Sequence, residues 1–411
     1  MSWRTRLFAP ALLLGMVMGC SSARPFDGFV GDPSILSELP GRLLVLADDQ
    51  GLATIRPDGS ERLELARTEE GVIRSQPSWS PDGSRIAWTE IWKEAEAFLV
   101  TANSEGEELT RDPAPFGAVY VSWDPASRRV AFSGTDPEDG RLFLALAEPG
   151  HSMEVIDEGA PMWIDWSGDG SELLVHIAGQ AEIVRIDGGA RTLLPTDGQF
   201  RVGIHLGDRY VFTRGEEVGE MLAVGTFDGH DTTELMRVGH PTAYVIDRQH
   251  SRLAVMSVAS SSTQALSREE PGDRPILAPN RLVVVNLADG KVEDVAQARA
   301  VSWSWSPDGR SLLYSIIDRQ TNDGGLRWHI WDGEASVPYQ RFIPTGVFGR
   351  DYLAFFDQFD LSHSFWAPDG SAFVYAGGSS DQDRGIWVQR VGQAAAVRVS
   401  EGEVALWSPV P

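Results

Sequence analysis

The sequence contains a single cysteine, Cys20, and only two lysines, Lys93 and Lys291, among 411 residues. One cysteine excludes an intramolecular disulfide and a cysteine-based zinc site. The 35 basic side chains are outnumbered by 59 acidic ones, the formal net charge is −24, and no stretch concentrates positive charge. We therefore expect no nucleic-acid partner. With 42% hydrophobic residues, 42 glycines and 24 prolines, the composition predicts a globular, turn-rich chain.

Sequence motifs of common catalytic and metal sites are also missing. The eight histidines are scattered singly, and neither a G-x-S-x-G nucleophile elbow nor a phosphate-binding glycine pattern occurs. Two acidic loops, 136–140 and 381–385, lack the spacing and the terminal Glu of a calcium loop. We therefore expect no metal and no cofactor, and the sequence favours a non-enzymatic role.

The N-terminus is typical of a secretory signal peptide over residues 1–19. Arg4 and Arg6 precede an apolar run over residues 7–18, which is followed by Gly19. The run is too short to cross a bilayer as a helix, which takes about 20 residues. We expect residues 20–41 to form a tether between this segment and the folded domain.

The four residues 17–20, Val-Met-Gly-Cys, resemble a bacterial lipobox. This resemblance implies cleavage before Cys20 and acylation of its sulfur, by palmitate for example, so that the chain is anchored to a membrane. Ser21 in the next position resembles lipoproteins sorted to the outer membrane, facing the periplasm or the cell surface. The alternative is an ordinary signal peptide with a chance cysteine.

The rest of the chain carries an internal repeat. Each copy begins with a tryptophan, which is followed by Ser-Pro-Asp-Gly in two copies and by a variant of it in the others, and an apolar triplet starts seven residues after the tryptophan. The five clear copies begin at Trp79, Trp123, Trp166, Trp305 and Trp366. Two degenerate copies lie around Ile204 and Ile246. Because Pro and Gly set the backbone of a tight turn and apolar runs flank it, each copy predicts a β-hairpin.

Most of the tryptophans should pack between repeats, and the repeated Asp should shape the hairpin turn. A second turn follows in each unit, marked by a glycine. These glycines are Gly59, Gly106, Gly150, Gly188, Gly229, Gly290, Gly333 and Gly392. Eight second turns predict eight four-stranded units, with seven as the alternative.

The two ends of the domain look like the halves of one unit. The chain stops half-way through a repeat at residues 406–409, and the other half begins at Arg42. We therefore expect the C-terminal strand to complete the first sheet, which closes a ring and removes an open sheet edge.

These repeats resemble the WD40-like (PD40) repeats of TolB-type β-propellers, and the resemblance covers residues 42–411. It implies an all-β fold, an eight-bladed β-propeller of four-stranded antiparallel blades forming a single domain. It says little about chemistry, because propellers host many unrelated functions. TolB carries an additional N-terminal α/β domain, whereas here we expect only about 20 residues between Cys20 and the first strand.

Two neighbouring intervals between copies are long, 59 residues from Ile246 to Trp305 and 61 from Trp305 to Trp366. The first holds a polar insert at about 258–280, which we expect to be a mobile loop. The second holds an insert at about 344–361 that combines aromatic rings with charges. Both should leave the ring on the same rim, opposite the Pro-Asp-Gly turns.

Aromatic rings beside an arginine are typical of a recognition surface. We therefore predict a partner-binding rim, whose residues are Trp92, Arg350, Tyr352, Phe355, Phe356 and Phe359. The alternative is that these rings fold back to cover the central channel or pack on the last two blades.

The sequence thus favours a lipid-anchored interaction module of the cell envelope that binds a protein or peptide. Two alternatives stay open: a lactonase-like or other hydrolase with its active site in the central channel, and a carbohydrate- or peptidoglycan-binding module. Carboxylates and histidines gathered at one point of the channel would favour the hydrolase. A channel filled with apolar side chains would favour the interaction module.

Overall fold

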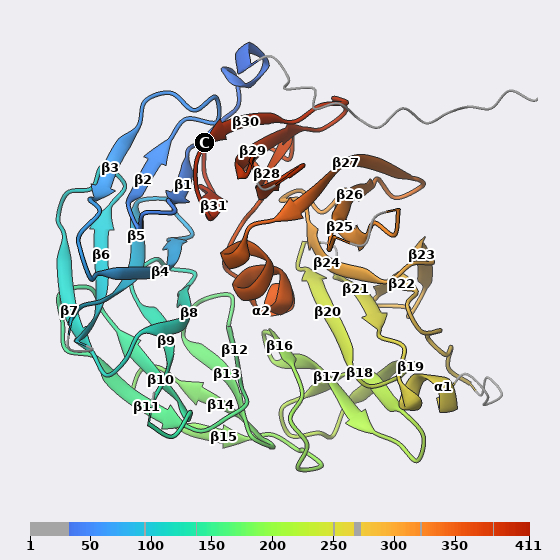
Figure 1. The fold of residues 1–411 in the computed structure, drawn as a ribbon. Coiled ribbons are helices and arrows are strands. Elements are labelled where there is room, and N and C mark those ends of the chain that lie inside the picture. Colours follow the sequence, from blue (N-terminus) through green and yellow to red (C-terminus); the bar gives the residue numbers. More distant parts are fainter. Residues whose placement is uncertain are drawn as a thin grey trace, which may run out of the picture.

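A computed structural model describes residues 33–93, 96–136, 138–249, 251–266, 273–320, 323–380 and 382–411. The predicted signal peptide and Cys20 lie outside the described residues. Almost all regular structure in the described part is antiparallel β-strand, and the sheets follow one another around a ring (Figure 1). The all-β prediction is confirmed.

The described strands form seven sheets, six of them four-stranded. Sheet 1 consists of β1 (Leu43–Leu46), β2 (Leu52–Ile55), β3 (Leu63–Ala66) and β31 (Val404–Trp407). Sheet 2 consists of β4 (Ile73–Trp79), β5 (Arg85–Ile91), β6 (Ala97–Asn103) and β7 (Thr110–Ala114). Sheet 3 consists of β8 (Ala118–Trp123), β9 (Val130–Thr135), β10 (Leu142–Ala147) and β11 (Glu154–Glu158). Sheet 4 consists of β12 (Met162–Trp166), β13 (Glu172–Ile177), β14 (Gln180–Arg185) and β15 (Arg191–Leu193). Sheet 5 consists of β16 (Gly203–Leu206), β17 (Arg209–Gly215), β18 (Glu220–Thr226) and β19 (Thr232–Val238). Sheet 6 consists of β20 (Thr242–Asp247), β21 (Arg252–Ser257), β22 (Leu282–Asn286) and β23 (Val292–Ala296).

Sheet 7 has seven strands and holds what the repeats predict as the last two blades. Its strands are β24 (Ala300–Trp305), β25 (Leu312–Ile317), β26 (Leu326–Trp331), β27 (Ser336–Pro344), β28 (Ala372–Gly378), β29 (Gly385–Arg390) and β30 (Val397–Ser400). The two halves meet where Ile343 pairs with Gly378 and Pro344 with Gly377. A separate bridge from Trp366 to Phe373 lies next to β28.

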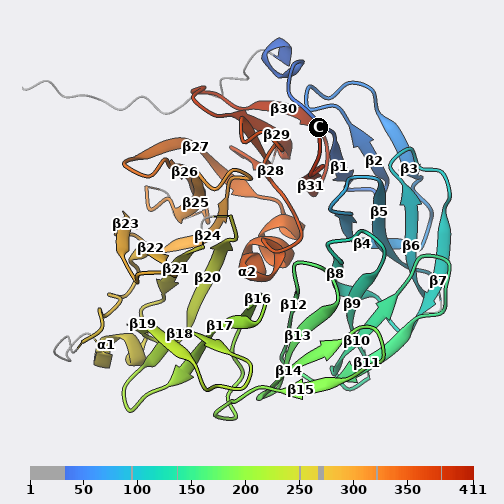
Figure 2. The ribbon, with the colours of Figure 1, turned by 180° about the vertical axis from the view of Figure 1, so that it is seen from behind.

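The ring is closed by the two ends of the domain. β31 pairs antiparallel with β1, with Leu43 opposite Trp407 and Leu46 opposite Val404. The two strands lie side by side in the views from both sides (Figures 1 and 2). The predicted completion of the first sheet by the C-terminal strand is confirmed.

The hairpin turns form as the repeat predicts. In the first copy, Asp82 Oδ1 accepts hydrogen bonds from Ser80 Oγ at 2.7 Å and from the backbone N–H of Ser84 at 3.0 Å. Gly83 follows with φ of 69°, a conformation that suits glycine. Both bonds recur at Asp169 and Asp308, and Asp369 accepts the backbone N–H of Ser371 at 2.9 Å, while Ala367 stands in place of the serine. The repeated Asp therefore shapes the turn.

The first insert is more ordered than its composition predicts. α1 (Ser261–Leu266) lies within it, and Thr263 and Leu266 are buried. Further along, Ile276 bridges to Arg237 of β19, and Leu277 is 1% exposed. The prediction of a loop with little to bury is therefore wrong for these residues, because the few apolar side chains of the insert fill a gap beside sheet 5.

The start of the described chain also packs on the ring. A 3-10 helix, η1 (Pro33–Leu36), places Leu36 in the core at 0% exposure, and Leu39 is 3% exposed. Arg390 Nη1 donates a hydrogen bond to the carbonyl of Ile35 at 2.7 Å. The last residues of the segment expected to be a tether thus contact β29. No helix among the described residues is long and apolar enough to cross a membrane.

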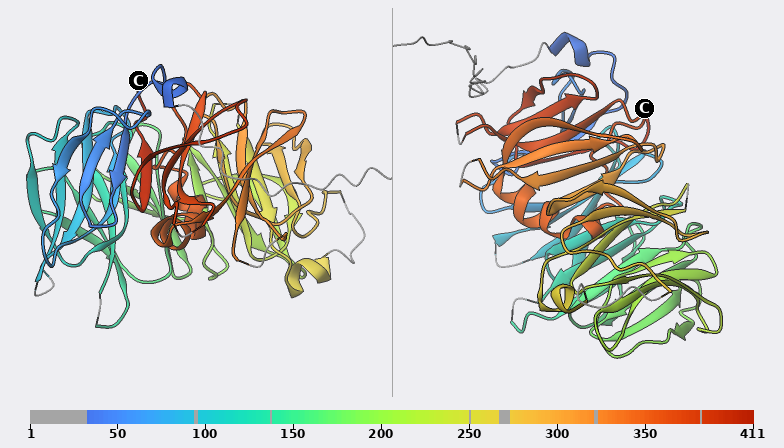
Figure 3. Two further views of the ribbon diagram at one scale, coloured as in Figure 1. Left: turned by 45° about the horizontal axis from the view of Figure 1, so that its top comes forward. Right: turned by 90° about the vertical axis from the view of Figure 1, so that its right-hand side faces the viewer.

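The second insert occupies the centre of the ring. We call residues 345–363 the plug; it contains η3 (Phe348–Tyr352, a π-helix), η4 (Leu353–Phe355, a 3-10 helix) and α2 (Phe356–Phe359). Figure 1 shows α2 in the middle of the ring, and in the left view of Figure 3 it lies on the same side as α1. The structure thus follows the alternative in which the rings of this insert cover the channel.

Candidate functional site in the central channel

The plug leaves one side of the channel open, the side of the Pro-Asp-Gly turns. A pocket of about 430 Å³ remains there. Its walls come from sheets 1, 2, 3, 4, 6 and 7, and its floor is the end of the plug. The residues that line the pocket include Trp79, Pro81, Tyr120, Asp165, Gly168, Arg248, Ser304, Asp360, Ser362, His363 and Trp407. A pocket of this volume is within the usual range for ligand sites, about 300–1,000 Å³.

The repeat itself builds the wall of this pocket. In four of the five clear copies, and at Trp407, the tryptophan ends the strand nearest the channel. Four pairs made by such a tryptophan and the third residue of its motif line the pocket: Trp79 with Pro81, Trp123 with Pro125, Trp166 with Gly168, and Trp407 with Pro409. Their rings anchor neighbouring sheets, since Trp79 Nε1 donates to the carbonyl of Leu406 at 3.4 Å. The tryptophans therefore pack between sheets, as predicted, and their remaining edges give the pocket an apolar wall.

The degenerate copy in sheet 6 places a charge in the wall. Arg248 stands where four of the five clear copies carry proline, and its side chain is 41% exposed. Its Nη2 donates to both carboxylate oxygens of Asp165 at 2.8 Å, and Nη1 donates to the carbonyl of His205 at 2.6 Å. The Asp165 side chain is only 4% exposed. This ion pair links sheets 4, 5 and 6 beside the pocket.

Asp360 supplies the polar floor. It follows α2 directly and lines the pocket beside Ser304 and Arg248. Burial raises the pKa of Asp360 to about 7, although a hydrogen bond from Ser304 and the charge of Arg248 act in the opposite direction. Burial also raises the pKa of Asp357, one turn earlier, to about 6. The floor thus changes charge near neutral pH.

A chain of polar side chains fastens the plug to sheets 3 and 4. Ser362 Oγ lies 2.7 Å from Tyr120 Oη and 2.6 Å from His363 Nδ1. Gln358 Nε2 donates to the carbonyl of Ile164 at 2.9 Å. These contacts hold the end of the plug against β8 and β12, so the floor of the pocket is fixed.

The Ser362–His363 pair has the outline of a nucleophile and its base, but its surroundings oppose that chemistry. His363 is 3% exposed and packs against the rings of Tyr120, Tyr352 and Phe359. Burial lowers the pKa of His363 to about 3. Such an imidazole is a weak base at neutral pH, whereas an effective general base has a pKa near the working pH. The Ser362–His363 pair therefore lacks an effective general base at neutral pH.

The residues predicted for a binding rim are divided by the structure. Tyr352 and Phe359 are 1% and 3% exposed, and Phe356 packs on Trp303 with ring centroids 4.2 Å apart. Phe355 is 60% exposed and does not line the pocket. In this conformation Tyr352 and Phe359 are thus not open to a partner, and the surface role of Phe355 stays a prediction.

Arg350 and Trp92 also lie outside the central pocket. Arg350 is exposed and pairs with its neighbour Asp351 at 2.8 Å. Trp92 is half-buried, and its Nε1 donates to Glu90 Oε2 at 3.1 Å. Glu90 is fully buried and also pairs with Arg74 at 2.9 Å. Trp92 therefore extends a buried ion-pair network of sheet 2.

Sequence reasoning missed Asp165, Arg248, Asp360 and His363. Asp165, Arg248 and Asp360 lie far apart along the chain, so no local sequence spacing predicts that they form one site. The one available signal was the degenerate copy around Ile246, in which Arg248 takes the position that proline holds in four of the five clear copies. Among the described residues, no group of three His, Cys, Asp or Glu side chains is placed to hold a metal ion.

The raised pKa of Asp360 predicts a pH-dependent stability. Between its unfolded pKa of 3.8 and its folded pKa of about 7, the folded protein binds the proton more tightly. Stability from this group is therefore full below about pH 4 and is lost as pH rises toward 7. Asp360→Asn, which mimics the protonated form, should be more stable than wild type at pH 8 by on the order of 1–3 kcal/mol, with little difference at pH 4.

Denaturant unfolding at the two pH values measures this difference. Asp208→Asn, at an exposed turn position, is the matched control and should show no pH-dependent gain. Equal stability of Asp360→Asn and wild type at both pH values would show that folding does not raise the pKa of this carboxyl.

No family model matches the sequence, and no curated protein matches it. Solved structures do. The β-propeller domain of the Trilobed protease from Pyrococcus furiosus is 13% identical, with a TM-score of 0.50 over 82% of this chain and 100% of that one. A eukaryotic initiation factor is 12% identical, with a TM-score of 0.53 over 90% and 98%. TolB from Acinetobacter baumannii is 14% identical, with a TM-score of 0.37 over 74% and 66%.

At such identities these likenesses show the fold alone, a β-propeller. The resemblance of the repeats to TolB-type propellers is confirmed at that level. The Pyrococcus propeller is described as having an open velcro topology, whereas here β31 pairs with β1.

Proposed function

We propose that this chain is an interaction module of the cell envelope that holds a peptide segment of a partner protein in the central pocket. The observation that carries the proposal is the combination of a filled channel with an open pocket of about 430 Å³ on one side. Peptide-binding pockets commonly combine aromatic walls with a few placed polar groups. Here Trp and Pro side chains form the wall, and Asp360 and Arg248 supply the polar groups.

The rigidity of the pocket supports a binding role. Its floor is fixed by the bonds of Gln358 and Ser362, and its wall by the Asp165–Arg248 pair. A preformed site loses little conformational freedom when it binds. The low pKa of His363 and the apolar packing of the plug favour this module over the hydrolase alternative.

We further infer that sheet 7 comprises two blades, which gives eight in all. Only two residue pairs join β27 to β28, whereas β28 and β29 share six. The Trp366–Phe373 bridge stands where a fourth strand of the last blade would lie. The repeat count from the second-turn glycines supports the same number.

The envelope location rests on the N-terminal segment. We propose that Cys20 is acylated and tethers the ring to the outer membrane, on the periplasmic or the outer side. Cys20→Ala should abolish incorporation of a fatty-acid probe and leave the precursor uncleaved by the lipoprotein peptidase. Metabolic labelling with an alkyne fatty acid tests this, and equal labelling of variant and wild type would sink the lipid anchor.

A matched pair of glycines allows the pocket to be tested. Gly168 lines the pocket mouth, and Gly346 lies on the opposite side, near the start of the plug; a Cβ at either would meet no atom within 4 Å. Peptides selected from a phage-displayed library on the wild-type protein should bind Gly168→Trp at least tenfold more weakly. Their affinity for Gly346→Trp should be unchanged. Loss of binding in Gly346→Trp alone would move the site to the plug side.

A further inference from the structure

A second cavity, of about 390 Å³, lies away from the channel, between sheets 4 and 5. Leu174 and His176 of β13 form one wall, and Tyr210, Phe212 and Thr213 of β17 form the other. Thr196 and Gln199, in the connection between the two sheets, are exposed at its edge. The cavity is therefore open to solvent and separate from the central pocket.

The cavity exists because the repeat in sheet 5 is degenerate. β16 has the sequence Gly-Ile-His-Leu and carries no tryptophan to fill the space beside sheet 4. Gly203 faces the cavity, and a Cβ there would meet Leu174 at 2.8 Å. Small residues thus leave open between these two sheets a volume that large rings fill elsewhere.

Three polar groups face this cavity without a hydrogen-bond partner among the described residues. They are His176 Nε2, which is a fully buried atom, and two hydroxyls, Tyr210 Oη and Thr213 Oγ1, on side chains of residues that are 4% and 8% exposed. Burial lowers the pKa of His176, so the ring is neutral; because its Nδ1 accepts the backbone N–H of Arg201 at 3.4 Å, Nε2 carries the proton and is a donor. Buried polar groups normally have partners, and leaving one unpaired costs about 1–3 kcal/mol. Their convergence on one cavity points to a ligand that satisfies them.

The charges around the cavity are balanced within the protein. Arg201 pairs with Glu220 at 3.2 Å and with Asp197. Arg214 pairs with Glu216 at 3.2 Å and with Glu234. Among the described residues of the wall, Asp228 is the one charged side chain outside an ion pair, and its Oδ1 accepts hydrogen bonds from Thr226 Oγ1 at 2.6 Å and from the His230 N–H at 3.0 Å.

One wall of the cavity is aromatic. The rings of Tyr210 and Phe212 stack with centroids 4.6 Å apart and planes at 20°. An apolar ring surface beside hydroxyl and imidazole groups matches a molecule that has an apolar face and a rim of hydroxyls. Sugar rings have this character.

We propose that this cavity binds a neutral saccharide of one or two rings, with its hydroxyls bonded to His176 Nε2, Tyr210 Oη and Thr213 Oγ1 and its apolar face toward Phe212. The site is distinct from the central pocket and does not depend on peptide binding there. A propeller with both sites would hold a partner at its centre and a glycan at its side.

Saturation-transfer NMR with the full domain tests this proposal. The probes are glucose, galactose, N-acetylglucosamine and their β-1,4-linked disaccharides, each against glucuronate and glucosamine as charged competitors. We expect at least one neutral probe to bind. The double variant Tyr210→Phe/Thr213→Val, which removes two hydroxyls and keeps the shape of both side chains, should weaken it at least tenfold. Tyr339→Phe, whose hydroxyl accepts the Gly392 N–H outside the cavity, is the matched control and should bind normally.

Three outcomes overturn the proposal: no transfer to any neutral probe, an affinity that the double variant leaves unchanged, or tighter binding of a charged sugar. Thermal melts of both variants confirm folding before titration. Gly168→Trp should leave saccharide binding intact, which distinguishes a failure of this site from a failure of the central pocket.

Discussion

Deleting residues 403–411 is expected to destabilise the whole ring and to make the protein aggregate. The deletion removes β31, whose four residues pair with all of β1. Leu406 and Trp407 are each 1% exposed, and Trp407 Nε1 donates to the carbonyl of Pro40 at 2.9 Å. Loss of a buried tryptophan alone costs about 3–5 kcal/mol. The strand loss adds an exposed sheet edge, which promotes association.

Thermal melting and size-exclusion chromatography measure the effect. Deletion of Pro411 alone, an exposed residue, is the control and should melt like wild type. Because β31 adds as a single strand, a synthetic peptide of residues 403–411 should restore part of the lost stability in trans. A truncated protein with unchanged melting temperature and solubility would show that the ring does not need this strand.

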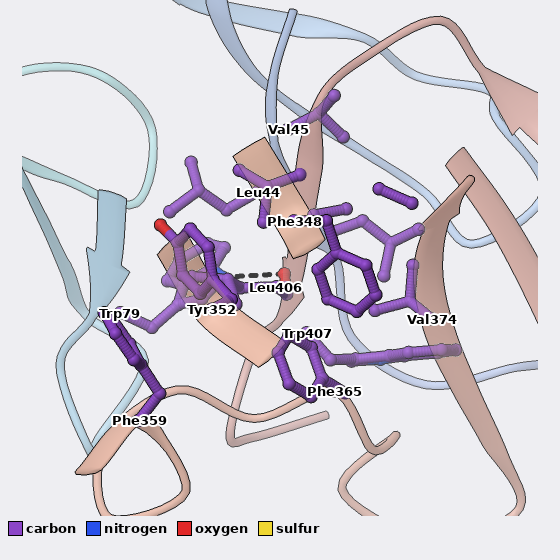
Figure 4. Close-up of a cluster of buried hydrophobic side chains, with 14 of the residues drawn as sticks. Leu44, Val45, Trp79, Phe348, Tyr352, Phe359, Phe365, Val374, Leu406 and Trp407 are labelled. Atoms are coloured by element: carbon purple, nitrogen blue, oxygen red, sulfur yellow. Dashed lines mark hydrogen bonds between the residues drawn. The ribbon is translucent and has the colours of Figure 1, made fainter. Parts of the chain in front are cut away.

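The second large effect concerns the plug. Phe359→Ala should lower the free energy of unfolding by about 3–5 kcal/mol, since the ring is buried against Tyr120, Tyr352 and His363. Figure 4 shows Phe348, Tyr352 and Phe359 of the plug together with Leu406 and Trp407 of β31 in one buried cluster. Phe355→Ala, four residues earlier and 60% exposed, should change stability by less than about 0.5 kcal/mol.

Urea unfolding of the two variants side by side separates a fixed plug from a movable one. Equal and small effects would mean that the plug leaves the channel easily, which would reopen the predicted aromatic rim as a binding surface. A large loss in Phe355→Ala would place that ring in a contact that the structure does not show.

Most of the fold could be predicted because each repeat encodes its own hairpin. The Trp frame gave the strands nearest the channel, and its Asp and Gly gave the turns. One repeat is split between the two ends of the domain, at residue 42 and at residues 406–409, and this split predicted that the C-terminal strand closes the ring. These features are local, so one sequence suffices to find them. The division of sheet 7 depends on how long β27 extends, which no turn signal marks.

The plug shows where sequence reasoning stops. Its rings recur at Tyr352, Phe355, Phe356 and Phe359, a spacing that gives a helix an apolar side. The composition cannot tell whether that side meets a partner or the chain's own channel. The channel was available because its inner strands present Tyr120, Ile164 and Trp303, and these lie far from the plug in sequence.

The central pocket was hidden for the same reason. Asp165, Arg248 and Asp360 come from different sheets, and only ring closure brings them together. In the degenerate copy around Ile246, Arg248 takes the position that proline holds in four of the five clear copies, and a repeat protein offers signals of this kind. Positions where one copy departs from the others mark places where the ring is specialised.

The most direct test of the account is photo-crosslinking from the pocket mouth in living cells. A benzoyl-phenylalanine at Gly168 should yield a covalent adduct with a peptide of another envelope protein, identified by mass spectrometry, and the same residue at Gly346 should not. Adducts formed only from Gly346 would contradict the central claim that the pocket on the turn side of the channel holds the partner.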